Sequence, residues 1–173
     1  VIDTPNKFLF LVQGDGKALR YGIGVGRPGF TWSGVKQVSA KREWPDWRPP
    51  PEMLKRQPGL PRHMKGGPGN PLGARAMYIG STIYRIHGTH EPDSVGEADS
   101  SGCIRLNNED VVDLYDRVKI GAKVIVVDPR LTPIARAAAA AVNPSLIARR
   151  QRRTASRRIA ASLLMGSAAI FDA

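Results

Sequence analysis

Short apolar runs separated by glycine and proline constrain the fold of this chain more than any other feature of its sequence. Lys7 to Val12 and Ala18 to Val25 are two such runs, and a Gly-rich turn at 13–16 separates them. Runs of this length around a four-residue turn predict a β-hairpin. The 18 glycines and 14 prolines among 173 residues also favour strands and loops over long helices. We therefore expect a mostly β protein.

Later segments extend the pattern. Residues 31–40 alternate loosely and are a candidate third strand, and the β-like runs 77–79 and 83–87 are joined by a glycine turn. Asn107 or Asn108 is a good N-cap for a helix, because acidic residues follow it and apolar residues recur at helical spacing. Gly121 is expected to end this helix, and the apolar run 123–127 predicts a further strand.

Residues 41–61 change character, because they contain Trp44, Trp47 and six prolines. The prolines exclude a regular strand and allow at most a short helix over Pro51 to Gln57. Two interpretations stay open: a stiff surface loop whose tryptophans cover the edge of the core, or an aromatic wall or lid of a binding cleft. His63, in the loop that follows, is expected to lie exposed without a function.

The basic charge of the chain is unevenly distributed. The net charge is +11, but residues 1–130 carry 19 Lys and Arg against 14 Asp and Glu, whereas residues 131–173 carry 7 Arg against one Asp. Over half of the excess thus lies in the last quarter, so a groove that follows phosphates is not indicated and no nucleic-acid partner is expected. We expect a domain over 1–129 and an Ala- and Arg-rich C-terminal extension over 130–173. Its composition allows a helix, and its arginines could touch an anionic surface.

Two further expectations concern targeting. The chain starts at Val1 without a methionine, so we expect a fragment or a mature form from which the targeting segment is missing. No run of about 20 apolar residues occurs in the sequence, so no membrane span is expected.

The segment Ile86 to Leu106 carries the residues suited to catalysis. It holds the only cysteine, Cys103, and two of the three histidines, His87 and His90. A thiol with an imidazole nearby is the minimum equipment for cysteine nucleophilic catalysis, and His87 is preferred to His90 because it ends a predicted strand. A buried, inert cysteine is the alternative. The histidines and the cysteine lack paired metal-ligand spacing, so neither a metal nor a cofactor is expected.

Two neighbours of Cys103 add to this interpretation. Gly102 permits a close backbone approach or an unusual dihedral angle. Arg105 lies two residues further on, so on a strand it would share a face with Cys103 and could grip a substrate carboxylate. The alternative for Arg105 is a salt bridge to an acidic residue between 109 and 116.

The sequences IHGT and SSGCIRLNNEDV, with His87 and Cys103 sixteen positions apart, resemble the L,D-transpeptidase catalytic domain (YkuD-type) family. DLYDRVKIGAKVIVV continues the resemblance, which extends more weakly over residues 1–129 and includes the start, VIDTPNKFLFLV. The resemblance implies an L,D-transpeptidase-like β-sandwich with one or two short helices and with the cysteine in a cleft.

The resemblance also implies roles for individual residues. Cys103 would be the nucleophile and His87 the base, with the Gly88 carbonyl as the group that orients it. Backbone N–H groups near Gly102 and Cys103 would form an oxyanion hole. Many family members have histidine where this chain has Ser101, a difference expected to alter substrate positioning without removing the base. The substrate-binding positions implied by the match are Arg105, Ser101, Gly102, Thr89 and Asn108.

The substrates implied are peptidoglycan stem peptides in the bacterial cell envelope, in the periplasm. Cys103 would release D-Ala and form a thioester. An amine of a neighbouring stem, an envelope lipoprotein or an outer-membrane protein would then resolve it, while water would give an L,D-carboxypeptidase side activity. Carbapenem-type inhibitors are implied as well. The alternative function is a non-catalytic peptidoglycan- or envelope-binding module of the same fold, which would bind through the basic extension and the Trp44/Trp47 loop.

Overall fold

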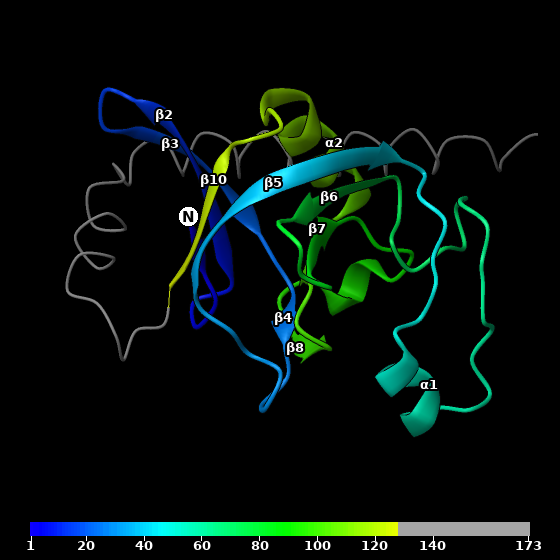
Figure 1. Cartoon of the computed structure of the whole chain (residues 1–173). Coiled ribbons are helices and arrows are strands. Elements are labelled where there is room, and N and C mark those ends of the chain that lie inside the picture. The colour runs from blue at the N-terminus through cyan, green and yellow to red at the C-terminus, as the bar shows by residue number, and fades with distance from the viewer. Residues whose placement is uncertain (128–173) are drawn as a thin grey trace, which may run out of the picture.

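The computed structural model describes residues 1–127, which are built mainly from strands (Figure 1). The strands are β1 (Ile2–Asp3), β2 (Phe8–Gly14), β3 (Lys17–Gly22), β4 (Val25–Gly26), β5 (Gly34–Glu43), β6 (Arg75–Ile79), β7 (Arg85–His87), β8 (Ala98–Ser100), β9 (Ile104–Arg105) and β10 (Lys123–Val127). The helices of this region are α1 (Pro51–Arg56) and α2 (Asn108–Arg117), and η1 (Pro92–Ser94) is a single 3-10 turn. The predicted mostly β fold with one or two short helices is confirmed, whereas the extension 130–173 lies outside the described residues.

Eight strands form one sheet in the order β3-β2-β1-β10-β5-β6-β7-β9, and β4 pairs with β8 in a separate ribbon. β1 and β10 pair in parallel, so the first and last described strands lie side by side within the sheet. The core beneath the sheet includes Ile23, Met77, Ile79 and Leu106, none more than 1% exposed. β7 and β9, which lie at the two ends of the segment 86–106, form one end of this sheet.

The predicted hairpin is present as β2 and β3, with Phe8 opposite Gly22 and Val12 opposite Ala18. Its turn places Asp15 and Gly16 at φ of 50° and 68°. Glycine adopts this left-handed region without the steric cost that other residues incur. The predicted third strand begins three residues later than expected, at Gly34, and Trp32 before it stacks on Tyr84. The strand also continues to Glu43, three residues beyond the predicted end, because residues 41–43 pair with β6, so the exclusion of a strand from 41–61 was wrong for these three.

Helix α2 packs on the sheet through Val111 and Leu114, which are almost fully buried. The helix ends at Arg117 and not at the predicted Gly121, because Val118 turns to an extended conformation and joins the core. Lys41 of β5 covers this end: its ammonium donates to the carbonyls of Tyr115 (2.5 Å) and Val118 (2.7 Å). A cation at the negative end of the helix dipole stabilises the helix.

The proline-rich segment leaves the sheet after β5 and carries α1 at a distance from it (Figure 1). α1 confirms the predicted short helix. Trp47 is only 9% exposed and pairs with Met64, which agrees with a covering role, whereas Trp44 is 43% exposed. The guanidinium of Arg56 lies 5.0 Å from the ring centroid of Phe30, which joins α1 to the loop before β5. Neither helix of the described region is long and apolar enough to cross a membrane.

Candidate active site

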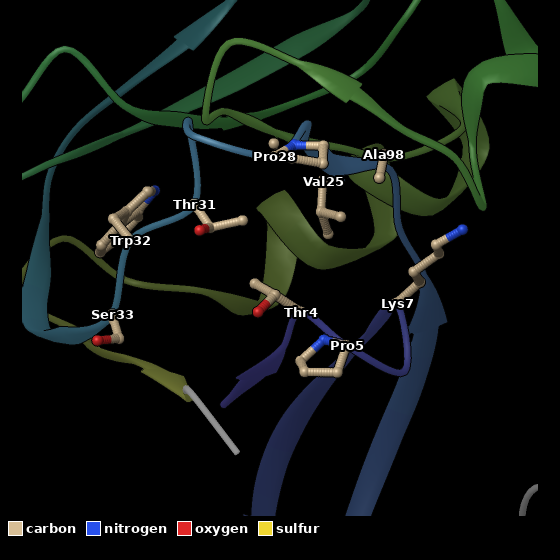
Figure 2. A pocket seen from close by; sticks show the side chains of 10 residues that line it. Thr4, Pro5, Lys7, Val25, Pro28, Thr31, Trp32, Ser33 and Ala98 are labelled. Atoms are coloured by element: carbon tan, nitrogen blue, oxygen red, sulfur yellow. The ribbon is translucent and has the colours of Figure 1, made fainter. Parts of the chain in front are cut away.

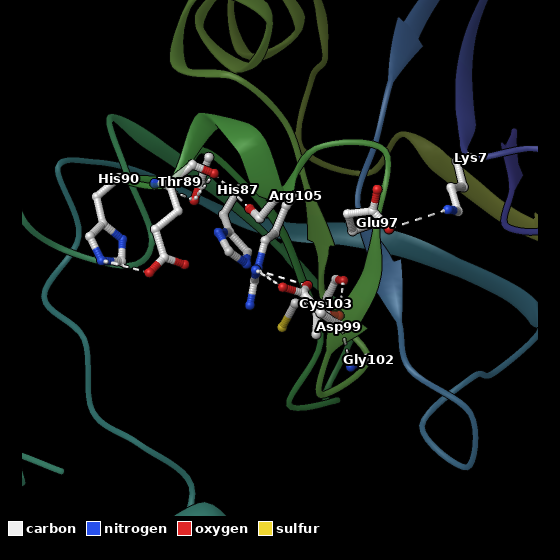
Figure 3. Close-up of polar contacts among 12 residues, drawn as sticks. Lys7, His87, Thr89, His90, Glu97, Asp99, Gly102, Cys103 and Arg105 are labelled. Atoms are coloured by element: carbon white, nitrogen blue, oxygen red, sulfur yellow. Dashed lines mark hydrogen bonds and ion pairs between the residues drawn. The ribbon is translucent and has the colours of Figure 1, made fainter.

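β7 and β9 bring the predicted catalytic residues together. They pair in parallel, with Ile86 opposite Ile104 and His87 opposite Arg105. Both isoleucines point into the core. Side chains alternate along a strand, so His87 and Arg105 share the opposite face of the sheet, and Cys103, directly before β9, is presented on that face as well. Figure 3 shows the imidazole, the guanidinium and the sulfur as one group.

His87 is buried, with 4% of its surface exposed, and its Nδ1 lies 2.6 Å from the carbonyl oxygen of Gly88. A carbonyl can only accept, so Nδ1 carries the proton and the lone pair of the neutral ring is on Nε2. Burial lowers the pKa of His87 from 6.5 to about 4; the Gly88 hydrogen bond opposes this change, and the charges of Arg105 and Arg85 reinforce it. At neutral pH the ring is therefore an unprotonated base in a fixed orientation.

Cys103 is a free, partly exposed cysteine, and its Sγ lies 4.0 Å from the carbonyl oxygen of Ile83. Burial raises the pKa of its thiol, while the backbone N–H, the charge and the side chain of Arg85, and the charge of Arg105, act in the opposite direction. The resting pair is thus a thiol beside a neutral imidazole. Such a pair can generate a thiolate by transfer of one proton to the ring.

Arg105 is already paired within the protein. Its Nη1 lies 3.0 Å and 3.3 Å from the two carboxylate oxygens of Asp99 on β8, and 21% of its side chain is exposed. The salt bridge considered from the sequence therefore exists, but its acidic partner precedes Cys103 and does not lie between residues 109 and 116. Within residues 1–127 this ion pair uses Nη1 alone, so Nε and Nη2 can still meet a substrate carboxylate.

The loop before Cys103 is held by Ser100, a residue that the sequence analysis did not single out. The hydroxyl of Ser100, which is 2% exposed, donates to the Cys103 carbonyl (2.7 Å) and accepts from the Gly102 N–H (3.1 Å). The adjacent Ser101, which the family match favoured, makes neither bond. The Gly102 N–H is thereby occupied, which leaves that of Cys103 as the candidate oxyanion donor of the two.

Gly102 has the unusual geometry expected of it. Its φ is +105°, and a Cβ at this position would lie 2.5 Å from Cε1 of Tyr84 and 3.0 Å from the Phe30 carbonyl oxygen. The Trp32 indole donates to the Gly102 carbonyl (2.9 Å), and its ring stacks on Tyr84 at 4.8 Å. Only glycine fits this conformation and this space together.

Three other predicted residues build the frame around His87. The Asn108 side chain donates to the Thr89 carbonyl (2.9 Å) and accepts from the Ala74 N–H (2.9 Å). The Thr89 hydroxyl, buried, accepts from the Glu91 N–H at 3.0 Å. A Cβ at Gly88 would collide with Asn108. These contacts give Gly88, Thr89 and Asn108 a positional role, and contact of Thr89 or Asn108 with substrate stays a prediction.

The other two histidines contact carboxylates outside the candidate site. His90 is exposed, sits 3.7 Å from a carboxylate oxygen of Glu91 and points away from the sulfur in Figure 3. His63 is exposed as predicted, and its Nε2 lies 2.9 Å from Asp46. Within residues 1–127, no three or more His, Cys, Asp or Glu side chains are grouped so that they could hold a metal ion.

A cavity of about 400 Å³ lies between the N-terminal loop, the β4–β8 ribbon and the loop before β5 (Figure 2). Thr4 and Lys7 line one part of it, Val25 and Ala98 of the β4–β8 ribbon line another, and Trp32 lies at one end. Neither Cys103 nor His87 lines this cavity. Trp32 connects the two regions, since it also bonds to the Gly102 carbonyl.

Comparison with protein families places most of the chain in one of them. The family profile of the L,D-transpeptidase catalytic domain (YkuD) matches residues 1–126. Over 137 residues the chain is 40% identical to the probable L,D-transpeptidase ErfK/SrfK of Escherichia coli (strain K12). The matched region covers 74% of this chain and 43% of that protein. A putative L,D-transpeptidase of Fuscovulum blasticum is 38% identical over 97 residues, 56% of this chain and 51% of the relative. The chain spans about half or less of the length of these curated relatives.

Solved structures agree in fold. An L,D-transpeptidase from Mycobacterium smegmatis gives a TM-score of 0.57 at 23% identity, over 73% of this chain and 56% of that one. The Ldtfm–avibactam carbamoyl enzyme gives a TM-score of 0.57 at 25% identity, over 73% of this chain and 47% of that one. The catalytic domain of the E. faecium L,D-transpeptidase acylated by ertapenem gives a TM-score of 0.55 at 24% identity, over 73% of this chain and 93% of that one.

Proposed function

Because this chain belongs to the L,D-transpeptidase catalytic domain family, we propose that it is a cysteine-dependent acyltransferase acting on peptidoglycan stem peptides. One observation carries the proposal: the thiol of Cys103 shares a sheet face with His87, whose Nδ1 is fixed by the Gly88 carbonyl. The Nε2 lone pair is then the group that receives the thiol proton. We place the activity in the bacterial cell envelope, in the periplasm, where these substrates lie.

In the first half-reaction, the sulfur of Cys103 attacks the carbonyl carbon between the L-centre of diaminopimelate and the terminal D-Ala. The thiol proton passes to Nε2 of His87, and the carbonyl oxygen becomes an oxyanion that the Cys103 N–H can stabilise. The C–N bond then breaks, D-Ala leaves with the proton from His87, and a thioester remains on Cys103.

In the second half-reaction, an amine attacks the thioester carbonyl and gives its proton to Nε2 of His87. The C–S bond breaks, the sulfur regains that proton, and a new amide forms. The amine of a neighbouring stem gives a 3-3 cross-link, and that of a lipoprotein or an outer-membrane protein gives protein attachment. Water in place of the amine gives L,D-carboxypeptidase activity. The nearby Arg105 offers free guanidinium nitrogens to a carboxylate of the bound peptide.

The test is D-Ala release from a purified tetrapeptide muropeptide. The unaltered protein should release D-Ala, Cys103→Ala should release none, and His87→Gln should be reduced at least about a hundredfold. His90→Gln is the matched control, because His90 is exposed and should be dispensable. Equal release by Cys103→Ala and the unaltered protein would refute the proposal.

A carbapenem provides a second measurement, since the E. faecium relative is one whose catalytic domain has been acylated by ertapenem. Ertapenem should add its mass to the unaltered protein and not to Cys103→Ala. Binding to peptidoglycan sacculi with neither D-Ala release nor acylation would instead favour the non-catalytic module.

A further inference from the structure

Arg85 occupies a position next to Cys103 that the proposed mechanism has not used. It lies two residues before His87 on β7, so both side chains are on the face that carries the site. Continuing the β7–β9 register by one residue sets Arg85 opposite Cys103, as His87 is opposite Arg105. The thiol is therefore flanked by two arginines on neighbouring strands.

The guanidinium of Arg85 and the sulfur of Cys103 both lie near the same carbonyl oxygen. Nη1 of Arg85 lies 3.2 Å from the carbonyl oxygen of Ile83, and Sγ of Cys103 lies 4.0 Å from the same oxygen. The ring of Tyr78 lies 5.2 Å from the guanidinium carbon and supports it on the sheet. Nε of Arg85 is buried and has no hydrogen-bond partner among the described residues. A buried donor of this kind gains a hydrogen bond when an anion forms within its reach.

The two arginines differ in charge compensation. Arg105 is paired with the carboxylate of Asp99. Within residues 1–127, no carboxylate oxygen lies within 4.0 Å of the Arg85 guanidinium. The site face therefore presents His87, Arg85, and the Arg105–Asp99 pair to the sulfur, and Arg85 contributes the uncompensated positive charge.

We propose that Arg85 is a further catalytic residue, which stabilises the sulfur anion of Cys103 when the thiol proton moves to Nε2 of His87. The S–H bond breaks, the proton forms an N–H bond on His87, and the negative charge left on sulfur faces the guanidinium. Of the influences that lower the thiol pKa against burial, the backbone N–H of Arg85 comes first, and the charge and the side-chain hydrogen bond of Arg85 follow, ahead of the charge of Arg105. The inference rests on the proposed role of Cys103 as nucleophile, but not on the identity of the substrate.

The test is the pH dependence of Cys103 alkylation by iodoacetamide, followed by intact mass, since the rate reports the thiolate and needs no stem peptide. Arg85→Met should raise the apparent thiol pKa by about one unit and lower the rate at pH 7 about tenfold. Arg85→Lys should restore most of the rate, because it returns the charge. Arg20→Met is the matched control: Arg20 also lies over an aromatic ring, that of Phe8 at 4.3 Å, but on β3.

Thermal unfolding is measured in parallel, and Arg85→Gln replaces Arg85→Met if the methionine variant does not fold. An alkylation profile of a folded Arg85→Met or Arg85→Gln that matches that of Arg20→Met overturns the role of Arg85, whatever the muropeptide assay gives. A shifted profile without D-Ala release by the unaltered protein supports the role of Arg85 and refutes the stem-peptide function instead.

Discussion

The hydroxyl of Ser100 is expected to hold the cysteine loop, and Ser100→Ala tests this. The hydroxyl is nearly fully buried and joins the Cys103 carbonyl at 2.7 Å to the Gly102 N–H at 3.1 Å. Alanine removes both bonds and adds nothing that can replace them. A buried polar group left without a partner costs about 1–3 kcal/mol. Two hydrogen bonds are lost together, so we expect a total loss of about 2–3 kcal/mol.

The free energy of unfolding is measured by urea titration of the whole chain, with the slope checked for constancy between variants. Ser101→Ala is the matched control, since it removes the same atom one position along the chain from a hydroxyl that makes neither bond. Its effect should stay within about 0.5 kcal/mol. D-Ala release should fall about ten- to a hundredfold in Ser100→Ala, because small displacements of a nucleophile are costly.

Two outcomes would contradict this view of the loop. In one, Ser100→Ala unfolds at the same urea concentration as the unaltered protein. In the other, Ser101→Ala loses as much stability as Ser100→Ala, which would mean that any truncation in this loop is disruptive. Ser100→Thr should recover part of the loss, since it retains a hydroxyl.

Three further predictions concern charged groups. The lowered pKa of His87, about 4, means that the unfolded chain binds a proton at His87 more readily, so the free energy of unfolding should fall as pH drops from 6.5 to 4, and His87→Asn should flatten this change in urea titrations at each pH. Asp99→Asn should leave stability within about 1 kcal/mol but should speed Cys103 alkylation at neutral pH, because Arg105 loses its counter-charge. Lys41→Met should lower the melting temperature by several degrees, roughly 1–2 kcal/mol, through loss of the α2 cap, and Lys41→Arg should lower it less.

The strands could be predicted wherever apolar runs are bounded by glycine, because a turn and an alternating pattern are local properties. The β2–β3 hairpin and β10 are examples. β4 and β9 have two residues each and are defined only by their partners, which lie far away in sequence. The end of α2 was misplaced for a related reason: Val118 enters the core and Lys41 covers the terminal carbonyls, and neither contact is visible in the helix's own sequence.

The candidate site, too, has residues that the sequence reveals and residues that only the fold reveals. Cys103 and His87 could be named as candidates from the sequence because their chemistry is carried by residue type, and their catalytic roles stay predictions. Ser100 and Ser101 are identical in type, and only the fold shows that the first is buried under the loop. Trp32 reaches Gly102 from 70 positions away. Arg85 could have been found from the sequence, because alternation along the strand that ends at His87 puts it on the same face.

Burial sets the resting state of the pair, and it explains why the cations near it should influence the reaction. It raises the pKa of Cys103 and lowers that of His87, so proton transfer from thiol to imidazole is opposed at both ends. A nearby positive charge favours the thiolate but disfavours the imidazolium, and these effects partly cancel. The Arg85 side chain acts on His87 through charge alone, whereas on Cys103 it acts through both its charge and a hydrogen bond. Its net effect therefore favours the transfer, and Arg85→Met should slow acylation less than it slows alkylation.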